Sequence, residues 1–262
     1  MVPRPNDDPA LRRFALVGPP ELGRFELADG EADHARRVLR LGLGDKLVGL
    51  DGAGAAWPLV VARSDARTFE VRGDGEPTRE PAPGEHGSGL PWIELATALP
   101  RGDRGESMVE RLAQLGAAVL RPLLAERASP EARNESPRRR ERLARSAREA
   151  CKQSGRLWSL AIEPGETPAS VLAHPALVDL RLDPHAPAQA FDILRDLDLA
   201  GTRASPIRLW VGPEGGFTPT EIRALDDAGA RPLCLGPHVL RIETAAEAGL
   251  ALVAAAAFAR RR

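Results

Sequence analysis

From residue 92 to the C-terminus, short apolar segments alternate with segments of helical periodicity. Strands are expected at 92–99, 118–126, 158–163, 177–183, 207–212 and 231–236, and helices at 105–117, 136–155, 218–229 and 243–262. Strand–helix alternation is typical of a parallel sheet covered by helices. The pattern therefore predicts an α/β domain with a mainly parallel sheet.

The segment DGEPTREPAPGEHGSGLP, residues 74–91, is rich in glycine, proline and charge and has no apolar period. Such a composition indicates a linker or a long loop. We therefore expect a small domain at 1–75, a linker at 76–91 and a larger domain at 92–262. In the small domain, strands expected at 45–52, 55–64 and 68–73 and one helix at 31–41 predict a small β-barrel. So short a segment cannot build a large core, which suggests an accessory binding module.

Composition excludes several classes of protein. The net charge of −1 gives no global attraction to nucleic acid, although all but two of the 36 basic residues are arginines, which bind phosphate in a fork. A GC-rich genome or a thermal habitat would explain that excess equally well. No apolar run is long enough to span a bilayer, and the N-terminus lacks a signal-peptide core, so we expect a cytoplasmic protein with no membrane partner. Two cysteines, Cys151 and Cys234, are too few for a disulfide framework or a zinc site, and no metal is expected.

The segment LWVGPEGGFTPTEI, Leu209–Ile222, joins an expected buried strand to a glycine-rich turn and a helix. Thr218 can cap that helix, with Pro219 at its first position and Glu221 completing a capping box. The turn matches neither common phosphate-binding pattern and offers no lysine, and Glu214 would repel a polyphosphate. It therefore favours a neutral or cationic ligand held by main-chain groups. A purely structural tight turn is the alternative.

A second segment, LCLGPHVLRIETAAEAG at 233–249, repeats the order of strand, Gly-Pro turn and helix. Arg241 and Glu243 flank the start of this helix, where the helix dipole favours a charged carboxylate. Ligands of open α/β sheets bind beyond the carboxyl ends of strands. We therefore expect the two turns to form one pocket.

Taken together, VGPEGGFTPTEI and LGPHVLRIETA closely resemble the paired C-terminal motifs of the bacterial 16S rRNA (uracil-N3)-methyltransferases. That family belongs to the SPOUT superfamily of S-adenosylmethionine-dependent enzymes. The segments DHARRVLRLGLGDKLVGLDG, ERLAQLGAAVLRPLLAERA and AREACKQSGR are also similar to the family, so the resemblance covers nearly the whole chain. The chain departs from the usual pattern at Arg101, Gln114 and His238, and it has LRLDPHAPAQA where many relatives have Leu-His-Pro.

The resemblance implies a knotted C-terminal domain, with a trefoil knot in its mainly parallel sheet, and a PUA-like RNA-binding β-barrel at the N-terminus. It implies a homodimer with S-adenosylmethionine held by loops at 181–184, 211–216 and 235–241. The cofactor-binding residues expected on this basis are Leu182, Val211, Gly212, Pro213, Glu214, Gly215, Gly216, Leu235, Gly236, Leu240 and Arg241.

The implied reaction is methylation of N3 of a uridine in 16S rRNA of the 30S subunit. N3 must lose its proton, so Arg241 could stabilise the resulting charge and Glu243 could take the proton or position a water. A plain cap or salt bridge between these two residues is the alternative. A 2′-O-ribose RNA methyltransferase of the same superfamily and a non-catalytic RNA-binding assembly factor remain the other candidate functions.

Basic residues would bind the RNA through its phosphates. A charge run can equally be a solvated helix face, and His34 can be a packing residue. The expected RNA-binding residues are Arg12, Arg13, His34, Arg36, Arg37, Arg40, Arg101, Arg104, Arg148 and Arg156.

Overall fold

A computed structural model describes residues 11–133, 136–187 and 189–260. The chain divides into two compact units. The first contains Met1–Ala82 and Cys151–Ser159, and the second contains Pro83–Ala150 and Leu160–Arg262. The first unit thus continues past the expected boundary at residue 75, and it takes in a segment from far along the chain that the sequence pattern did not reveal.

The first unit is built on a five-stranded sheet. Its strands follow the order β1-β2-β3-β4, with β5 paired to β3; β1 runs parallel to β2, and the other pairs are antiparallel. The expected helix at 31–41 is short and begins as an α-helix that continues as a π-helix. The elements of this unit are β1 (Arg13–Ala15), α1 (Glu31–Asp33), η1 (His34–Val38), β2 (Lys46–Leu50), β3 (Ala55–Ser64), β4 (Phe69–Gly73) and β5 (Thr78–Arg79).

Main-chain hydrogen bonds attach the returning segment Cys151–Ser159 to this sheet. The N–H of Gly54 donates to the carbonyl of Leu157 at 3.0 Å, and the N–H of Ser159 donates to the carbonyl of Gly52 at 2.9 Å. Trp158 adds an indole N–H bond to the carbonyl of Glu80 at 3.0 Å. Leu157 is 5% exposed in a small cluster with Val48 and Leu50, so the segment completes the apolar core of the unit.

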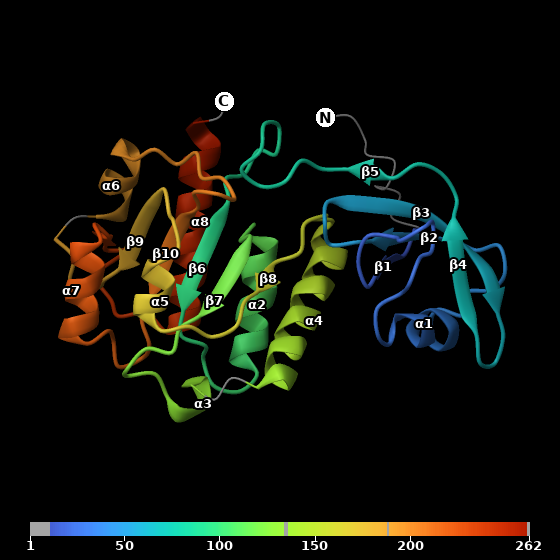
Figure 1. Ribbon diagram of the computed structural model, residues 1–262, viewed down its shortest axis with the longest axis horizontal. Helices are drawn as coiled ribbons and strands as arrows, with labels where there is room; N and C mark the ends of the chain where they lie inside the picture. The colour runs from blue at the N-terminus through green and yellow to red at the C-terminus, as the bar shows by residue number, and fades with distance from the viewer. Residues whose placement is uncertain (1–10, 134–135, 188, 261–262) are drawn as a thin grey trace. The chain divides into compact units, whose positions relative to one another are not determined.

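The second unit has a six-stranded sheet in the order β11-β9-β10-β6-β7-β8. Every neighbouring pair is parallel, which confirms the predicted α/β fold with a parallel sheet (Figure 1). All carboxyl ends therefore meet at one edge. The strands are β6 (Ile93–Thr97), β7 (Val119–Pro122), β8 (Ala161–Ile162), β9 (Val178–Leu182), β10 (Ile207–Val211) and β11 (Arg231–Leu233).

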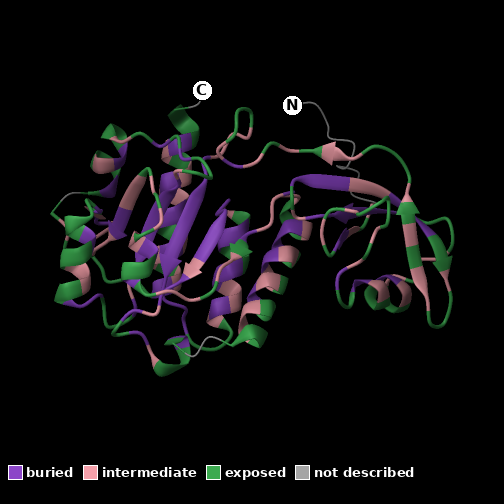
Figure 2. Cartoon of the chain, viewed as in Figure 1, coloured by how far each residue is buried: buried purple, intermediate pink, exposed green. Residues whose placement is uncertain are grey.

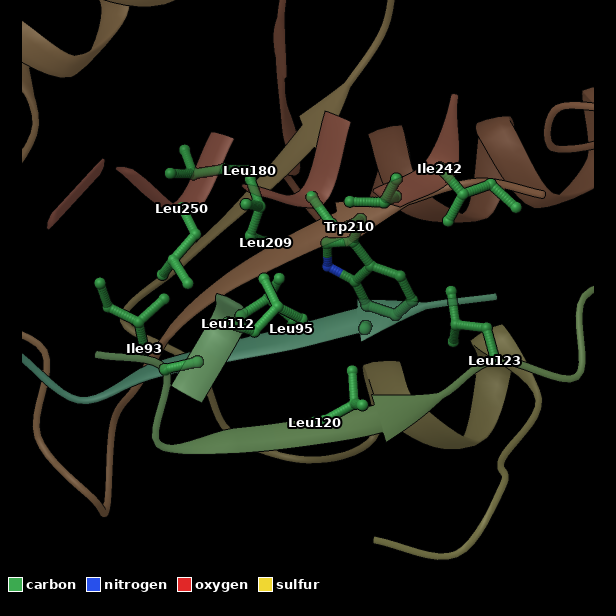
Figure 3. Close-up of a cluster of buried hydrophobic side chains, with 14 of the residues drawn as sticks. Ile93, Leu95, Leu112, Leu120, Leu123, Leu180, Leu209, Trp210, Ile242 and Leu250 are labelled. Atoms are coloured by element: carbon green, nitrogen blue, oxygen red, sulfur yellow. The ribbon is translucent and has the colours of Figure 1, made fainter. Parts of the chain in front are cut away.

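Helices cover this sheet, and their outward faces are exposed while the central strands are buried (Figure 2). The main core joins side chains from β6, β7, β9, β10, α2 and α8, with Leu95, Leu112 and Leu209 fully buried (Figure 3). The short helices α3, α5 and α6 were not expected. The helices are α2 (Arg104–Gln114), α3 (Pro130–Arg133), α4 (Pro137–Ser154), α5 (Pro168–Leu172), α6 (Ala190–Asp196), α7 (Pro219–Asp227) and α8 (Ile242–Arg260).

Helix α8 corrects the statement that no apolar run is long enough to cross a membrane. By length and composition it meets that criterion, with 19 residues and a mean hydropathy of 1.5. A core helix of a soluble protein passes the same test, and α8 packs directly on the sheet. A Cβ at Gly249 would lie 2.9 Å from the side chain of Leu182 and 3.0 Å from that of Leu209. Gly249 therefore lets the helix approach β9 and β10 closely.

Candidate active site

The loops that follow β9, β10 and β11 meet at the carboxyl edge of the larger sheet. Because β9 lies between β10 and β11, the two glycine-rich loops flank the loop after β9 rather than each other. The N–H of Asp183 donates to the carbonyl of Leu233 at 2.9 Å, and the N–H of Ala190 donates to the carbonyl of Cys234 at 2.9 Å. The Cys234 thiol lies 3.3 Å from the carbonyl of Gly236. Main-chain contacts thus hold the chain after β9 against the end of β11, while the single pocket expected from the two glycine-rich turns stays a prediction.

The glycine-rich loop after β10 has a fixed exit. The Glu221 N–H donates to the Thr218 hydroxyl at 3.2 Å, and the Thr218 N–H donates to the Glu221 carboxylate at 2.7 Å. This is the predicted capping box, with Pro219 at the first helical position. A Cβ at Gly212 would lie 3.1 Å from the ring of Phe217, which packs under the loop. The loop therefore has little freedom at either end.

Replacing Thr218 by alanine is expected to lower the free energy of unfolding by about 1 kcal/mol, because the cap hydrogen bond is lost. The matched control is Thr220→Ala in the same turn. Thr220 is exposed and only accepts a bond from Arg223 at 3.3 Å. Urea denaturation measures both changes, and equal effects of the two variants would contradict the capping role.

The loop after β9 is tied to α7 through Arg181. Its buried guanidinium lies 2.6 Å from the Asp183 carboxylate and 3.0 Å from that of Asp226. Burial alone would raise the pKa of Asp183, but hydrogen bonds from the His185 N–H and from Arg181 outweigh it and lower that pKa. Asp183 therefore remains an ionised carboxylate that fixes the loop.

Glu243, at the start of α8, has only 13% of its side chain exposed. Its Oε1 lies 3.3 Å from the Arg104 guanidinium, and the same guanidinium lies 3.3 Å from Oε1 of Glu214. These two carboxylates raise the pKa of Arg104, first through the hydrogen bond that Arg104 donates to Glu214. Within the described chain, the other oxygen of Glu243, Oε2, is buried and has no hydrogen-bond partner. A buried carboxylate oxygen without a donor can accept a proton or a hydrogen bond from a ligand.

The salt bridge between Arg241 and Glu243, which was the alternative to their catalytic roles, is not formed. Arg241 is exposed, and no ion pair joins it to any described residue. Its carbonyl accepts the N–H of Ala245 at 2.8 Å, so its main chain begins α8. Arg104, expected to bind RNA, instead holds Glu243 and Glu214 together. No local pattern signals this contact, because Arg104 and Glu243 are 139 positions apart.

The residues expected to hold the cofactor differ in exposure. At Gly236 and at Gly216 an added Cβ would meet no atom within 4 Å, so the main chain at both positions borders open space. This suits a ligand that is held by backbone groups. Val211 and Pro213 are buried; Leu182, Gly212, Leu235 and Gly236 are half-buried; Glu214, Gly215, Gly216, Leu240 and Arg241 are exposed.

The expected RNA-binding residues of the first unit fall into two groups. Arg12, His34, Arg37 and Arg40 are exposed. The other group has contacts within the unit: Arg36 bonds the Asp33 carboxylate at 2.7 Å, Arg13 donates to the carbonyl of Lys152 at 3.3 Å, and burial lowers the pKa of Arg156. In the second unit, Arg101 is exposed and Arg148 is half-buried on α4.

A family model described as an RNA methyltransferase domain matches residues 88–254. The chain belongs to this RNA methyltransferase family. Among its relatives, the ribosomal RNA small subunit methyltransferase E of Mycobacterium tuberculosis is 33% identical over 247 residues, covering 89% of this chain and 87% of the relative. The Synechocystis protein of the same name is 30% identical, covering 92% of this chain and 77% of the relative. These matches confirm the family that the two C-terminal motifs predicted.

Solved structures of this RNA methyltransferase family share the fold. A Legionella pneumophila protein described as a methyltransferase, in complex with the cofactor SAM, has a TM-score of 0.78 at 25% identity and covers 94% of this chain and 98% of its own. The ribosomal RNA small subunit methyltransferase E of Neisseria gonorrhoeae, bound to S-adenosyl methionine, has a TM-score of 0.74 at 24% identity. The match covers 92% of this chain and 95% of the Neisseria chain. In the described part of this chain, no group of three or more His, Cys, Asp or Glu residues could hold a metal ion.

Proposed function

We propose that this protein transfers a methyl group from S-adenosylmethionine to N3 of one uridine in 16S rRNA of the small ribosomal subunit. The observation that carries the proposal is Glu243, a buried carboxylate with one free oxygen beside glycine-rich loops that border open space. The names of the relatives and the cofactor in the two solved structures support it.

The residues present fit the cofactor. Val211–Gly216 and Leu235–Arg241 would hold it through main-chain groups, and Leu182 would complete the apolar wall. S-adenosylmethionine supplies a methyl group on a sulfonium cation. Glu214 and the ionised Asp183 place negative charge near that cation, whereas they would repel a polyphosphate.

The protein's part in the reaction is to position the base and remove its proton. Oε2 of Glu243 takes the N3 proton, while Arg104 fixes Oε1 from the other side. The deprotonated N3 would then offer its electron pair to the methyl group that the bound cofactor would supply. Arg241, exposed at the start of α8, supplies a positive charge near the negative charge that develops on the ring.

The finer features of the fold belong to the same proposal: a trefoil knot, a PUA-like barrel in the first unit, a homodimer and a cytoplasmic location. Asp183 contacts the last residue of β11 and Ala190 contacts Cys234 just after it; these contacts support the knot, because they keep the chain after β9 beside the end of β11. Exposed Val239 and Leu240 beside the site support the dimer, since an apolar patch next to a site favours a partner surface.

Replacing Gly236 by valine is expected to weaken S-adenosylmethionine binding at least tenfold and to leave the fold intact. A Cβ at this position meets no protein atom within 4 Å, so the valine would extend into the open space proposed for the ligand. Gly18→Val is the matched control, because a Cβ at Gly18 also meets nothing within 4 Å. Calorimetry measures both. No heat with the wild-type protein would indicate a non-catalytic assembly factor, and equal affinity of Gly236→Val would contradict the cofactor site.

A further inference from the structure

A separate cavity of about 150 Å³ lies at the same carboxyl edge, on the other side of β10. Its lining comes from the loops after β6, β7 and β10 and from the first residue of α8. The strand order β11-β9-β10-β6-β7 puts β10 between this cavity and the loops after β9 and β11. The glycine-rich loop, through Pro213–Gly215, therefore borders both places.

The size and walls of the cavity suit one planar ring. An apolar cavity of about 150 Å³ holds a benzene molecule. The apolar part of the lining includes Leu99, Pro213 and Ile242. Enzymes that modify a base in folded or paired nucleic acid take it out of the stack into such a pocket.

Two arginines, Arg101 and Arg127, also line the cavity. Arg127 donates to the carbonyl oxygens of Gly215 at 3.2 Å and Phe217 at 3.5 Å, and so touches the glycine-rich loop itself. Neither arginine has a carboxylate partner anywhere in residues 11–133, 136–187 and 189–260. The nearby carboxylate of Glu214 is paired with Arg104. Two positive charges without a carboxylate partner therefore line a cavity whose walls are partly polar and partly apolar.

We propose that this cavity receives the target uracil and that Arg127 and Arg101 donate hydrogen bonds to its two ring oxygens. The inference rests on the proposed function and names the base-binding part of the site. When N3 loses its proton, negative charge spreads over these oxygens, and fixed cations in a partly enclosed site stabilise it. Apolar walls and the Glu214 carboxylate favour a ring over a backbone phosphate in the same place.

The test uses single-turnover methylation of small ribosomal subunits from a strain that lacks this protein, with saturating subunits and S-adenosylmethionine. We expect Arg127→Gln to slow the reaction about 10- to 100-fold, because the variant loses one charged hydrogen bond to the ring. Arg127→Lys should retain part of the rate. The rate–pH profile of Arg127→Gln should shift to higher pH, because N3 ionises less readily without the cation. The affinity for S-adenosylmethionine should remain within about twofold. The control is Arg223→Gln on α7, an exposed arginine that bonds only the Thr220 hydroxyl.

Three outcomes would overturn the inference. One is an unchanged rate and pH profile in Arg127→Gln and in Arg101→Gln. Another is weaker binding of the variant to the subunit with no change in the saturated rate. If the slope of log affinity against log salt concentration also falls by about one, the arginine contacts a phosphate. The third is an equal rate loss in Arg127→Gln and Arg127→Lys with no shift of the pH profile, which indicates a structural role. If the wild-type protein forms no 3-methyluridine at all, the proposed function fails instead, so the two failures are distinct.

Discussion

Replacing Glu243 by glutamine is expected to slow methylation about 10²- to 10⁴-fold, the usual contribution of a general base. Glutamine keeps the size of the side chain but cannot accept the N3 proton. Since the proton must then pass to solvent, the residual rate should rise with pH over a range where the wild-type rate is level. Single-turnover rates at several pH values measure this, with S-adenosylmethionine affinity checked by calorimetry.

The control for this variant lies one turn further along α8. Glu247 is partly buried and pairs with Arg111 at 2.9 Å, in the same way that Glu243 pairs with Arg104. Glu247→Gln should leave both the rate and its pH dependence unchanged. A Glu243→Gln protein that keeps more than about half of the wild-type rate would show that the proton goes elsewhere.

The second large effect concerns stability. Arg208 on β10 is completely buried, and its guanidinium lies 3.3 Å from Asp179 on β9 and 3.8 Å from Glu94 on β6. It also donates to the carbonyl oxygens of Val171, His174 and Pro175 at 2.8–3.0 Å. Replacing Arg208 by methionine removes the arginine partner of Asp179 and the donor to three carbonyl oxygens, whereas Glu94 keeps Arg121 at 2.8 Å. We expect the free energy of unfolding to fall by about 3–5 kcal/mol.

Urea denaturation of the full chain measures this change, and Arg195→Met is the matched control. Arg195 pairs with Asp196 at 3.3 Å, but both side chains are mostly exposed. The control should therefore lose less than about 1 kcal/mol. If Arg208→Met lowers the free energy of unfolding as little as the control does, the interactions of Arg208 do not stabilise the fold.

Local sequence patterns predicted the α/β fold of the second unit and the helix cap at the carboxyl edge of its sheet. The strand at 207–212 and the capping box at Thr218 and Glu221 follow from residues next to one another in the chain, and both are present. Periodicity also placed the ends of α2 within three residues and those of α4 within one. These elements depend mainly on local propensity and pattern, which a sequence displays directly.

Long-range contacts were beyond the reach of the sequence pattern. Arg208 stands in a strand that was expected to be apolar, and its partners come from β6 and β9. The pairing of Arg104 with Glu243 in place of Arg241, and the return of Cys151–Ser159 to the first unit, likewise depend on tertiary structure. Arg127 could not be singled out from the sequence, because exposed arginines after strands are common. Only its position beside the cavity distinguishes it.

The most direct test of the account is nucleoside mass spectrometry of 16S rRNA from a strain that lacks this protein. We predict that one 3-methyluridine is lost, that the wild-type gene restores it, and that the Glu243→Gln gene does not. Loss of a 2′-O-methyl nucleoside instead, or an unchanged set of modified nucleosides, would contradict the proposed reaction.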